Sequence, residues 1–455
     1  MTPLEFLLTP IYIFLLHLFF KWKRKKLPDD TLKKYHRQAF WIKIIASILF
    51  VIYYTYLTGG DTRSLYYTEG YNFYQHLLSN HENWKYVFLK GTEYDPNLVF
   101  RHGNEGYFFQ EGNFMVIRLT ALLSFITFGK FVLINLIFGC FALSGIWKLF
   151  IFFYNQRPHL HKAFAISILF FPSVVFWSSG LLKDSLCMGA LGWLTYALWQ
   201  IFKRKNIVKN SILLFLSVYM LSVVKVYILL AYAPLLLLFF FLKRLQKIRF
   251  SFFKYLISII IFVSIIFIFS RVYNSLESEL DSYAIDNLAS SISSLNETIH
   301  NISASKGAES NFNLGAEFDG TFTGLLKISP FALTATFFRP FIWETGKISQ
   351  LMAAVESLIL IFFTLTIILK AGPFRLIKYI LSDPLIFFCM SFAITFGLFV
   401  GASTLNFGTL VRYKIPCLPF YTIALFLIHN KIKSIAAEKK LTFQAQVPPP
   451  SLSLA

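Results

Sequence analysis

Charged side chains stand at the ends of long apolar runs at five places in this sequence. The first place is Asp61, which follows an apolar run over residues 40–57 and the glycine pair 59–60. The other four places carry Lys183 with Asp184, Lys225, Arg339 with Glu344, and Arg412. Ionisable residues beside a hydrocarbon phase are costly to place and commonly mark a pathway for a substrate. These positions are therefore the first candidates for a functional site.

The four cations at these places suit the binding of a phosphate group. Arginine offers a planar fork that binds phosphate through two parallel hydrogen bonds, whereas lysine acts as a point charge. A lipid phosphate or pyrophosphate is held at the membrane surface by its lipid tail, and cations at helix ends would take up charge as the bond to it breaks. We expect this role for Arg339, Arg412, Lys183 and Lys225.

A carboxylate completes this chemistry, because the hydroxyl group of the acceptor must lose a proton as it attacks. We expect Asp61 to be that base, and Glu344 is the second candidate. Aromatic rings around such a site would stack on sugar faces, and the candidates are Tyr66, Tyr67, Trp177 and Trp343. The predicted chemistry is the transfer of a group from a lipid phosphate to a hydroxyl group.

Each of these residues also has a purely structural interpretation. Asp61 would be a solvated acid after a glycine helix cap, and Asp184 with Lys183 would cap the start of a helix. A lone lysine or arginine at a helix end commonly extends its charged head to the membrane surface. Arg339 and Glu344 would form a structural ion pair, and the aromatic residues would belong to the ordinary interfacial belt.

The composition places these residues in a membrane protein. Of 455 residues, 56% are hydrophobic and only 15% are charged, and a water-soluble chain cannot bury so much apolar surface. The formal net charge of +20 comes from basic residues spread between apolar runs, as the positive-inside rule requires. We therefore expect an all-α, polytopic membrane protein and no nucleic acid partner.

About eleven apolar runs have the length and composition of membrane spans. They lie at 4–20, 40–58, 131–153, 163–178, 184–202, 211–226, 227–242, 251–269, 348–369, 384–400 and 413–429. Six segments between them hold 27 of the 43 lysines and arginines, and with eleven spans all six fall on one side. That side is expected to be the cytoplasm, which places Asp61 and the other candidate residues on the outer face.

We expect one helical membrane domain over residues 1–440 and a disordered cytoplasmic tail over 441–455. Two long outer loops, 59–113 and 270–347, are expected to carry interfacial helices: one follows Asp61 over residues 64–78, and one covers 274–305, where apolar residues recur at helical spacing. The apolar stretch 114–128 would break the charge alternation if it crossed the membrane, so we expect it to be re-entrant or interfacial.

Short motifs resemble known families. An acid in the first outer loop directly after a span, followed by interfacial helices, is similar to the GT-C membrane glycosyltransferases, which use polyprenyl-linked sugars. Arg412-Tyr413-Lys414-Ile415-Pro416-Cys417-Leu418-Pro419 looks like the RY-x-x-P-x-x-P that opens a late span in many of these enzymes. Trp177-Ser178-Ser179-Gly180 with Lys183, and Arg339-Pro340-Phe341 with Trp343-Glu344, resemble motifs of bacterial envelope proteins related to exopolysaccharide polymerases of the Wzy and EpsG kind.

The resemblance implies a catalytic or metal-associated acid at Asp61 and a phosphate-binding Arg412, so a divalent cation is left open as a cofactor. The first loop has a single Asp where many GT-C enzymes show paired acids. The implied partners are a lipid-linked sugar donor, a glycan acceptor and membrane lipid, and the implied location is the bacterial cytoplasmic membrane with an extracytoplasmic active face. A transporter or flippase for a lipid-linked glycan and a non-catalytic envelope component remain alternatives, as do a single-sugar transferase and a repeat-unit polymerase.

Overall fold

The computed structural model describes residues 3–58, 60–100, 108–245, 312, 322–346, 348–404 and 406–446. All regular elements in these ranges are helices. The chain divides into two compact units, unit 1 (Met1–Leu236 with Gly408–Pro419) and unit 2 (Leu237–Phe407 with Phe420–Ala455). The single membrane domain over 1–440 stays a prediction.

Seven helices in the described ranges are long and apolar enough to cross a membrane. They are α1 (Pro3–Lys25), α2 (Asp30–Ile52) with the π-helix η1 (Tyr53–Thr58), α6 (Phe131–Gln156), α9 (Lys183–Phe202), α10 (Ile207–Leu245), α14 (Ile348–Ala371) and α16 (Pro384–Ser403). An eighth candidate is the pair α17 (Phe407–Tyr413) and α18 (Leu418–Gln446), which is bent by 62°. The all-helical, multi-pass membrane class is thus confirmed, whereas the number eleven stays a prediction.

One of the expected spans is interrupted in the structure, and another cannot be compared with it. The expected span 163–178 is divided into the short helices α7 (His161–Phe164), η7 (Ala165–Leu169) and α8 (Pro172–Trp177). The break has a local cause, because Pro172 favours an extended residue before it, and Phe171 has φ −68° and ψ 118°. The expected span 251–269 lies outside the described residues.

Helix α10 is interrupted at Lys225, whose φ of −153° and ψ of 78° are not helical. Lys225 contacts Asp184 at the start of α9, and Tyr232, further along α10, shares a hydrogen bond with Thr195 in α9. The part of α10 after Lys225 therefore runs in the same direction as α9. The part before it returns the chain from the far end of α9, so the chain reverses its direction where the sequence predicts a turn between the runs 211–226 and 227–242.

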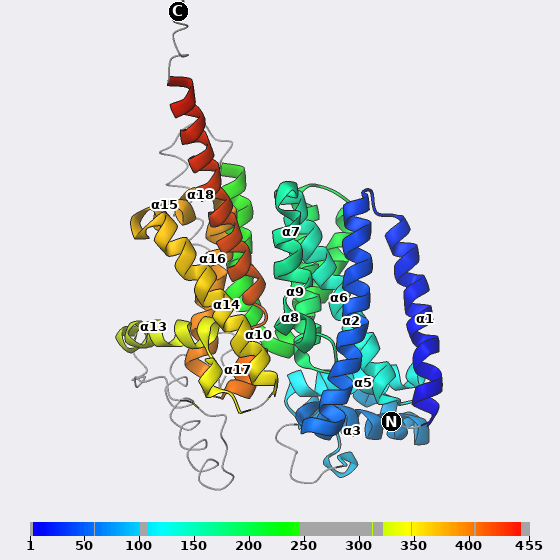
Figure 1. Cartoon of the computed structure of the whole chain (residues 1–455). Helices are drawn as coiled ribbons and strands as arrows, with labels where there is room; N and C mark the ends of the chain where they lie inside the picture. Colours follow the sequence, from blue (N-terminus) through cyan, green and yellow to red (C-terminus); the bar gives the residue numbers. More distant parts are fainter. Residues whose placement is uncertain are drawn as a thin grey trace, which may run out of the picture. The chain divides into compact units, whose positions relative to one another are not determined.

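The chain after α2 turns aside at Gly60, whose φ of +48° favours glycine. The π-helix η2 (Thr62–Tyr67) and α3 (Thr68–Ser79) follow, which confirms a helix over most of 64–78. Helix α5 (Glu111–Thr127) packs closely on α3, where Gly70 leaves room for Thr120. α3 and α5 lie across the lower ends of α1 and α2 in Figure 1. α5 is not among the candidate spans.

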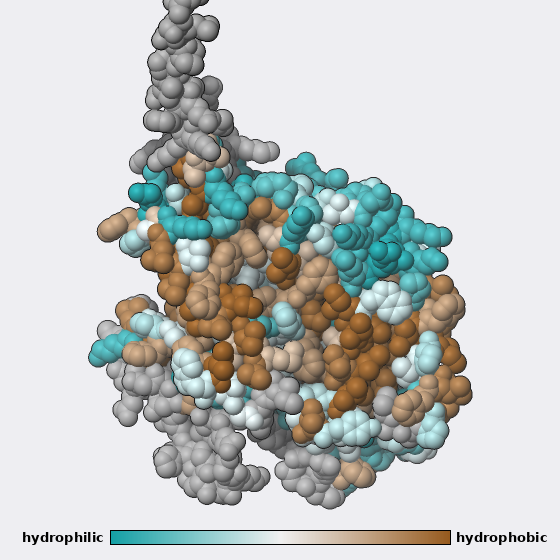
Figure 2. All heavy atoms as spheres, viewed as in Figure 1, coloured by the Kyte–Doolittle hydropathy of each residue, from teal (hydrophilic) through white to brown (hydrophobic). Residues whose placement is uncertain are grey.

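Close helix packing fixes the centre of unit 1. α6 and α9 make the most extensive contact between helices in the described residues. A Cβ atom added at Gly145 of α6 would lie 1.9 Å from the carbonyl oxygen of Gly189 of α9, so the two backbones touch as small residues allow. Figure 2 shows hydrophobic residues over the middle of this unit and hydrophilic residues at the end where α1 joins α2.

Unit 2 contains a helix that the sequence analysis did not predict. α13 (Phe322–Phe338) falls within the expected second outer loop and packs on α16. Gly401 of α16 lies against the carbonyl oxygen of Ala332, and Thr336 donates a hydrogen bond to the carbonyl oxygen of Gly397. The expected amphipathic helix over 274–305 lies outside the described residues. At the C-terminal end, α18 continues through residues 441–446, which were expected to begin the disordered tail; residues 447–455 lie outside the described residues.

Candidate functional site

The centre of the site is Asp184, in the first turn of α9. Its side chain is 1% exposed. The Nζ atom of Lys225 donates a hydrogen bond of 2.6 Å to its Oδ1 atom, and the Nε atom of Arg412 lies 3.5 Å from its Oδ2 atom. Lys225 also lies over the ring of Tyr413, 4.1 Å from the ring centre. Two cations from distant parts of the chain therefore share one buried carboxylate.

Asp61 forms the exposed edge of this group. Its side chain is 61% exposed, and its Oδ2 atom lies 3.8 Å from the Nη1 atom of Arg412. Arg412 thus lies between a buried acid and an exposed acid. The Nε atom of Arg412 and the Oδ2 atom of Asp184 are both buried without a hydrogen bond, and they face each other at 3.5 Å as an ion pair.

Lys183 adds a third cation next to Asp184 in the chain. It makes no hydrogen bond or ion pair with any residue in the ranges that the structure describes. Its Nζ atom lies 3.2 Å from the place where a Cβ atom on Gly112 would stand, so the amine sits against the start of α5. Together with Lys225 and Arg412, it gives three cations against two acids. The group therefore carries an excess positive charge.

The segment 178–182, which leads into α9, is irregular and buried, and other elements supply its hydrogen-bond partners. Asn135 of α6 accepts a hydrogen bond of 2.8 Å from the backbone nitrogen of Leu181, and Thr62 donates to the carbonyl oxygen of the same residue. Ser47 of α2 donates to the carbonyl oxygen of Ser179. Irregular backbone among membrane helices needs such internal partners. These contacts hold the start of α9, and hence Lys183 and Asp184, in place.

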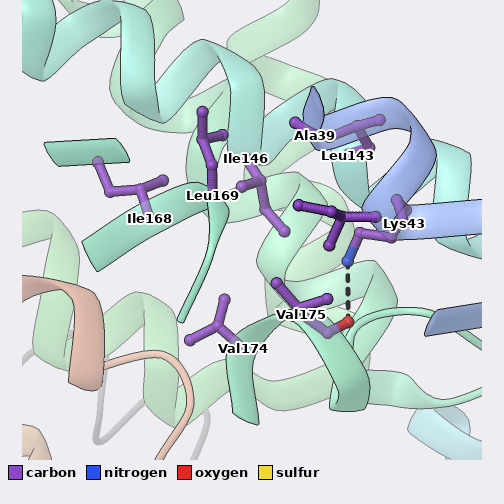
Figure 3. A pocket seen from close by; sticks show the side chains of 9 residues that line it. Ala39, Lys43, Leu143, Ile146, Ile168, Leu169, Val174 and Val175 are labelled. Atoms are coloured by element: carbon purple, nitrogen blue, oxygen red, sulfur yellow. Dashed lines mark hydrogen bonds between the residues drawn. The ribbon is translucent and has the colours of Figure 1, made fainter. Parts of the chain in front are cut away.

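Lys43 of α2 supports the same segment from the other side. Its Nζ atom donates hydrogen bonds to the carbonyl oxygens of Val175 and Ser178 and to the hydroxyl group of Ser178. Figure 3 shows the amine directed at Val175 beside a small cavity. The cavity has a volume of about 10 Å³, close to the minimum for one water molecule. Lys43 is 3% exposed, so it is a buried cation that serves the end of α8.

The candidate aromatic residues have different surroundings. Tyr66 is buried and donates a hydrogen bond to the side chain of Asn113; burial, and then the charge of Asp61, raise the pKa of this tyrosine, which keeps its hydroxyl group protonated. Tyr67 is half-buried and Trp177 is buried, whereas Trp343 is 82% exposed. Of these rings, Trp343 is the most accessible to a sugar, and the stacking roles stay predictions.

A second charged group lies within unit 2. The Nε atom of Arg339 lies 3.0 and 3.1 Å from the two carboxylate oxygens of Glu344. The guanidinium group also lies over the rings of Phe312 and Phe407, at 4.3 and 5.2 Å from their centres. This geometry matches the structural ion pair that the sequence analysis held as an alternative. The phosphate-binding role of Arg339 and the catalytic role of Glu344 stay predictions.

The structure therefore brings together four of the predicted site residues, Asp61, Lys183, Lys225 and Arg412. It adds Asp184, which the sequence analysis placed beside Lys183 without giving it a role in the chemistry. The sequence could have indicated Asp184, because an acid next to a lysine at the start of an apolar run is an ionisable pair whose placement beside hydrocarbon is costly. Asn135, Ser47 and Lys43 were missed because a polar residue within a span does not show which backbone group it serves.

The group does not resemble a metal site. In the part of the chain that the structure describes, no three His, Cys, Asp or Glu side chains gather closely enough to hold a metal ion. Asp61 and Asp184 both lie against Arg412, and a divalent cation would add charge to a group that already has an excess of cations. The arrangement is suited to bind an anion.

Comparison of the chain with protein-family models, with curated proteins and with solved structures finds no match. The resemblance to the GT-C and Wzy or EpsG families therefore stays a prediction based on the motifs.

Proposed function

We propose that this protein is an integral-membrane glycan transferase of the cell envelope. It takes a sugar or oligosaccharide from a polyprenyl phosphate or pyrophosphate donor on the extracytoplasmic face of the bacterial cytoplasmic membrane. The observation that carries the proposal is the group of three cations around buried Asp184, with the exposed carboxylate of Asp61 at its edge.

The excess positive charge supports the binding of the lipid phosphate. A cation that is removed from water is costly unless an opposite charge lies beside it, and Lys183 is partly buried and has no ion pair in the described residues. A phosphate group of the donor would supply that charge. Asp184 holds Arg412 through its Nε atom, so the terminal nitrogens, of which Nη1 lies 3.8 Å from the exposed acid Asp61, are the ones that would bind the phosphate. The contacts of Lys183 and Arg412 with the phosphate would strengthen as negative charge develops on the leaving group.

Asp61 is the group that would activate the acceptor. Its exposure leaves the carboxylate accessible to a hydroxyl group of the incoming glycan. In the transfer, the bond between the sugar carbon and the donor phosphate breaks, and the acceptor oxygen forms the new glycosidic bond. Asp61 receives the proton of the acceptor hydroxyl group, and the lipid phosphate leaves with the bonding electron pair.

The membrane topology of the proposal rests on the charge distribution. Eleven spans would place the six basic segments in the cytoplasm and the site outside. The reversal of the chain at Lys225 supports counting α10 as two spans. α9 contains 20 residues, so its two ends are about 30 Å apart, the thickness of a bilayer core. The basic turn after α9 and the site before it would thus lie on opposite membrane surfaces.

A transporter or flippase for a lipid-linked glycan is the second candidate. Transporter sites are commonly built from interrupted helices within the membrane. The breaks at Lys225 and between η7 and α8, together with the 62° bend between α17 and α18, favour this alternative. It would use the same cations to bind the phosphate but would leave the sugar–phosphate bond intact.

Reconstitution separates the candidates. The purified protein in proteoliposomes would receive a synthetic polyprenyl pyrophosphate sugar and a hydroxyl acceptor. The proposal predicts a glycosylated acceptor together with free polyprenyl pyrophosphate in equal amounts. Movement of the intact donor across the bilayer, without cleavage, would support the transporter. If neither cleavage nor movement exceeds that of protein-free vesicles, the protein is a non-catalytic envelope component.

A further inference from the structure

Helix α15 (Pro373–Ser382) is short, amphipathic and incompletely covered. It connects two candidate membrane spans, α14 and α16, and packs against both. A segment tied between the ends of two spans must lie close to a membrane surface. No residue of α15 is buried in the structure, so its outer face meets either water, lipid or another molecule.

The uncovered face of α15 is apolar. Phe374, Ile377 and Leu381 are 86%, 56% and 66% exposed, and their spacing of three and four residues places them on one side of the helix. Leu376 and Ile380 are only partly exposed. A 100° step per residue places them beside the exposed three on the wheel, so the apolar arc continues past the covered part of the helix.

Basic residues flank the same face. Arg375 and Lys378 are exposed on α15, and a step of 100° per residue places Lys378 about 40° and Arg375 about 100° from Phe374, on the same side of the apolar arc. Lys370 at the end of α14 is exposed as well. From α18, Lys431 donates a hydrogen bond of 2.6 Å to the hydroxyl group of Ser382. The nearest acid in the chain, Asp383, uses its side chain to cap the start of α16.

We propose that α15 is a membrane-surface helix that binds anionic phospholipid on the cytoplasmic leaflet. Its three exposed apolar side chains enter the boundary between head groups and acyl chains, while its cations meet the negatively charged head groups. This interaction surface is independent of the proposed transfer reaction, because it involves neither Asp61 nor any residue around Asp184.

The test uses the full chain in lipid nanodiscs, with an environment-sensitive fluorophore on an Ile377→Cys variant. The four native cysteines are buried, so labelling is directed to the new position, and Phe374 and Leu381 remain in place. Nanodiscs contain either phosphatidylcholine alone or phosphatidylcholine mixed with phosphatidylglycerol. A spin label high on the acyl chain quenches a probe that lies at the membrane surface. We expect strong quenching and a blue-shifted emission in the anionic discs, and weaker effects in the neutral discs.

Charge reversal identifies the head-group contribution. In the labelled protein, Arg375→Glu with Lys378→Glu should abolish the difference between the two lipids. Two cations near an anionic surface change the ratio of bound to released helix on the order of 30-fold. The control is Lys203→Glu with Arg204→Glu, which alters exposed cations between α9 and α10 and should keep the lipid difference. A probe that is exposed to water in both lipids would overturn the membrane contact. Equal quenching in both lipids would overturn the preference for anionic lipid.

Discussion

Arg412 is the residue on which the proposed site depends most directly. Its guanidinium group forms an ion pair with both acids, at 3.5 Å from Asp184 and 3.8 Å from Asp61. Arginine can hold the buried acid with one nitrogen and a phosphate with the others. Lysine carries the same charge on a single nitrogen and cannot do both.

The first prediction therefore compares two substitutions at this position. Arg412→Lys should lower glycan output nearly as much as Arg412→Ala, because the loss of the fork matters more than the loss of charge. The measurement is glycan output normalised to the amount of membrane-inserted protein. The matched control is Arg63, which lies near Asp61 in the chain and over the ring of Phe131; its Lys variant should keep its activity. Full activity of Arg412→Lys would exclude a phosphate fork at this position.

The second prediction separates stability from activity at the buried pair. Asp184→Asn leaves Lys225 buried without its counter-charge, and the free energy of unfolding should fall by about 3–5 kcal/mol. Adding Lys225→Met removes that cation too and should restore much of the stability. Thermal unfolding in nanodiscs measures this effect. The double variant should remain inactive, since the phosphate loses the cation Lys225 and Arg412 loses the buried acid that holds it. An active double variant would show that the pair has only a structural role.

At the scale of elements, the start of α9 is positioned by residues that the chain brings from three other segments. Lys43 and Ser47 come from α2, Asn135 from α6, and Thr62 from η2. Each serves a backbone group of the irregular stretch before Lys183. The precision of the site therefore depends on buried hydrogen bonds to this stretch rather than on α9 alone.

The third prediction concerns this support. Lys43→Met removes the hydrogen bonds to the carbonyl oxygens of Val175 and Ser178. The Val175 carbonyl keeps the hydroxyl group of Ser179 as a donor, so the expected cost is that of one unsatisfied buried carbonyl, about 1–3 kcal/mol. Both thermal stability and glycan output should fall. Lys33→Met on the same helix is the control, because Lys33 is an exposed residue whose ion pair with Asp30 is worth about 0.3–0.5 kcal/mol. Equal stability of the two variants would remove Lys43 from the support of the site.

The sequence predicted the four charges of the group because an ionisable residue at the end of an apolar run is conspicuous in a membrane chain. It did not predict their arrangement, since pairing is decided by which helix ends meet. Arg339 and Arg412 look alike in sequence, yet the first holds Glu344 and the second lies between two acids. The break before Pro172 and helix α13 were missed for a related reason, because apolar residues alone do not show where a helix ends or which face it covers.

For the whole molecule, the proposed function requires that the site faces the outside of the cell. The basic segments and the candidate residues occupy opposite ends of the apolar runs, which is the pattern of a multi-pass protein with an outer-face site. The structure separates the two ends within unit 1, where α9 begins at the site and ends at the basic turn 203–206.

The fourth prediction tests this orientation. A reporter fused at Asn80, an exposed residue after α3, should lie outside the cytoplasm, whereas one fused at Asn206, in the turn after α9, should lie in the cytoplasm. Paired reporters that are active only on opposite sides of the membrane measure this directly. A cytoplasmic signal at Asn80 would place Asp61 on the wrong side for an extracytoplasmic donor.

The most direct test of the central claim is the glycan output of cells that carry Asp61→Asn, normalised to membrane-inserted protein. Asparagine keeps the shape of the side chain but cannot accept the proton of the acceptor hydroxyl group. We expect glycan output to fall about 100-fold or more. The protein level should stay unchanged, since the exposed side chain contributes little to folding. Glycan output near that of the unmodified protein, from a normally inserted Asp61→Asn variant, would contradict a catalytic role for this acid.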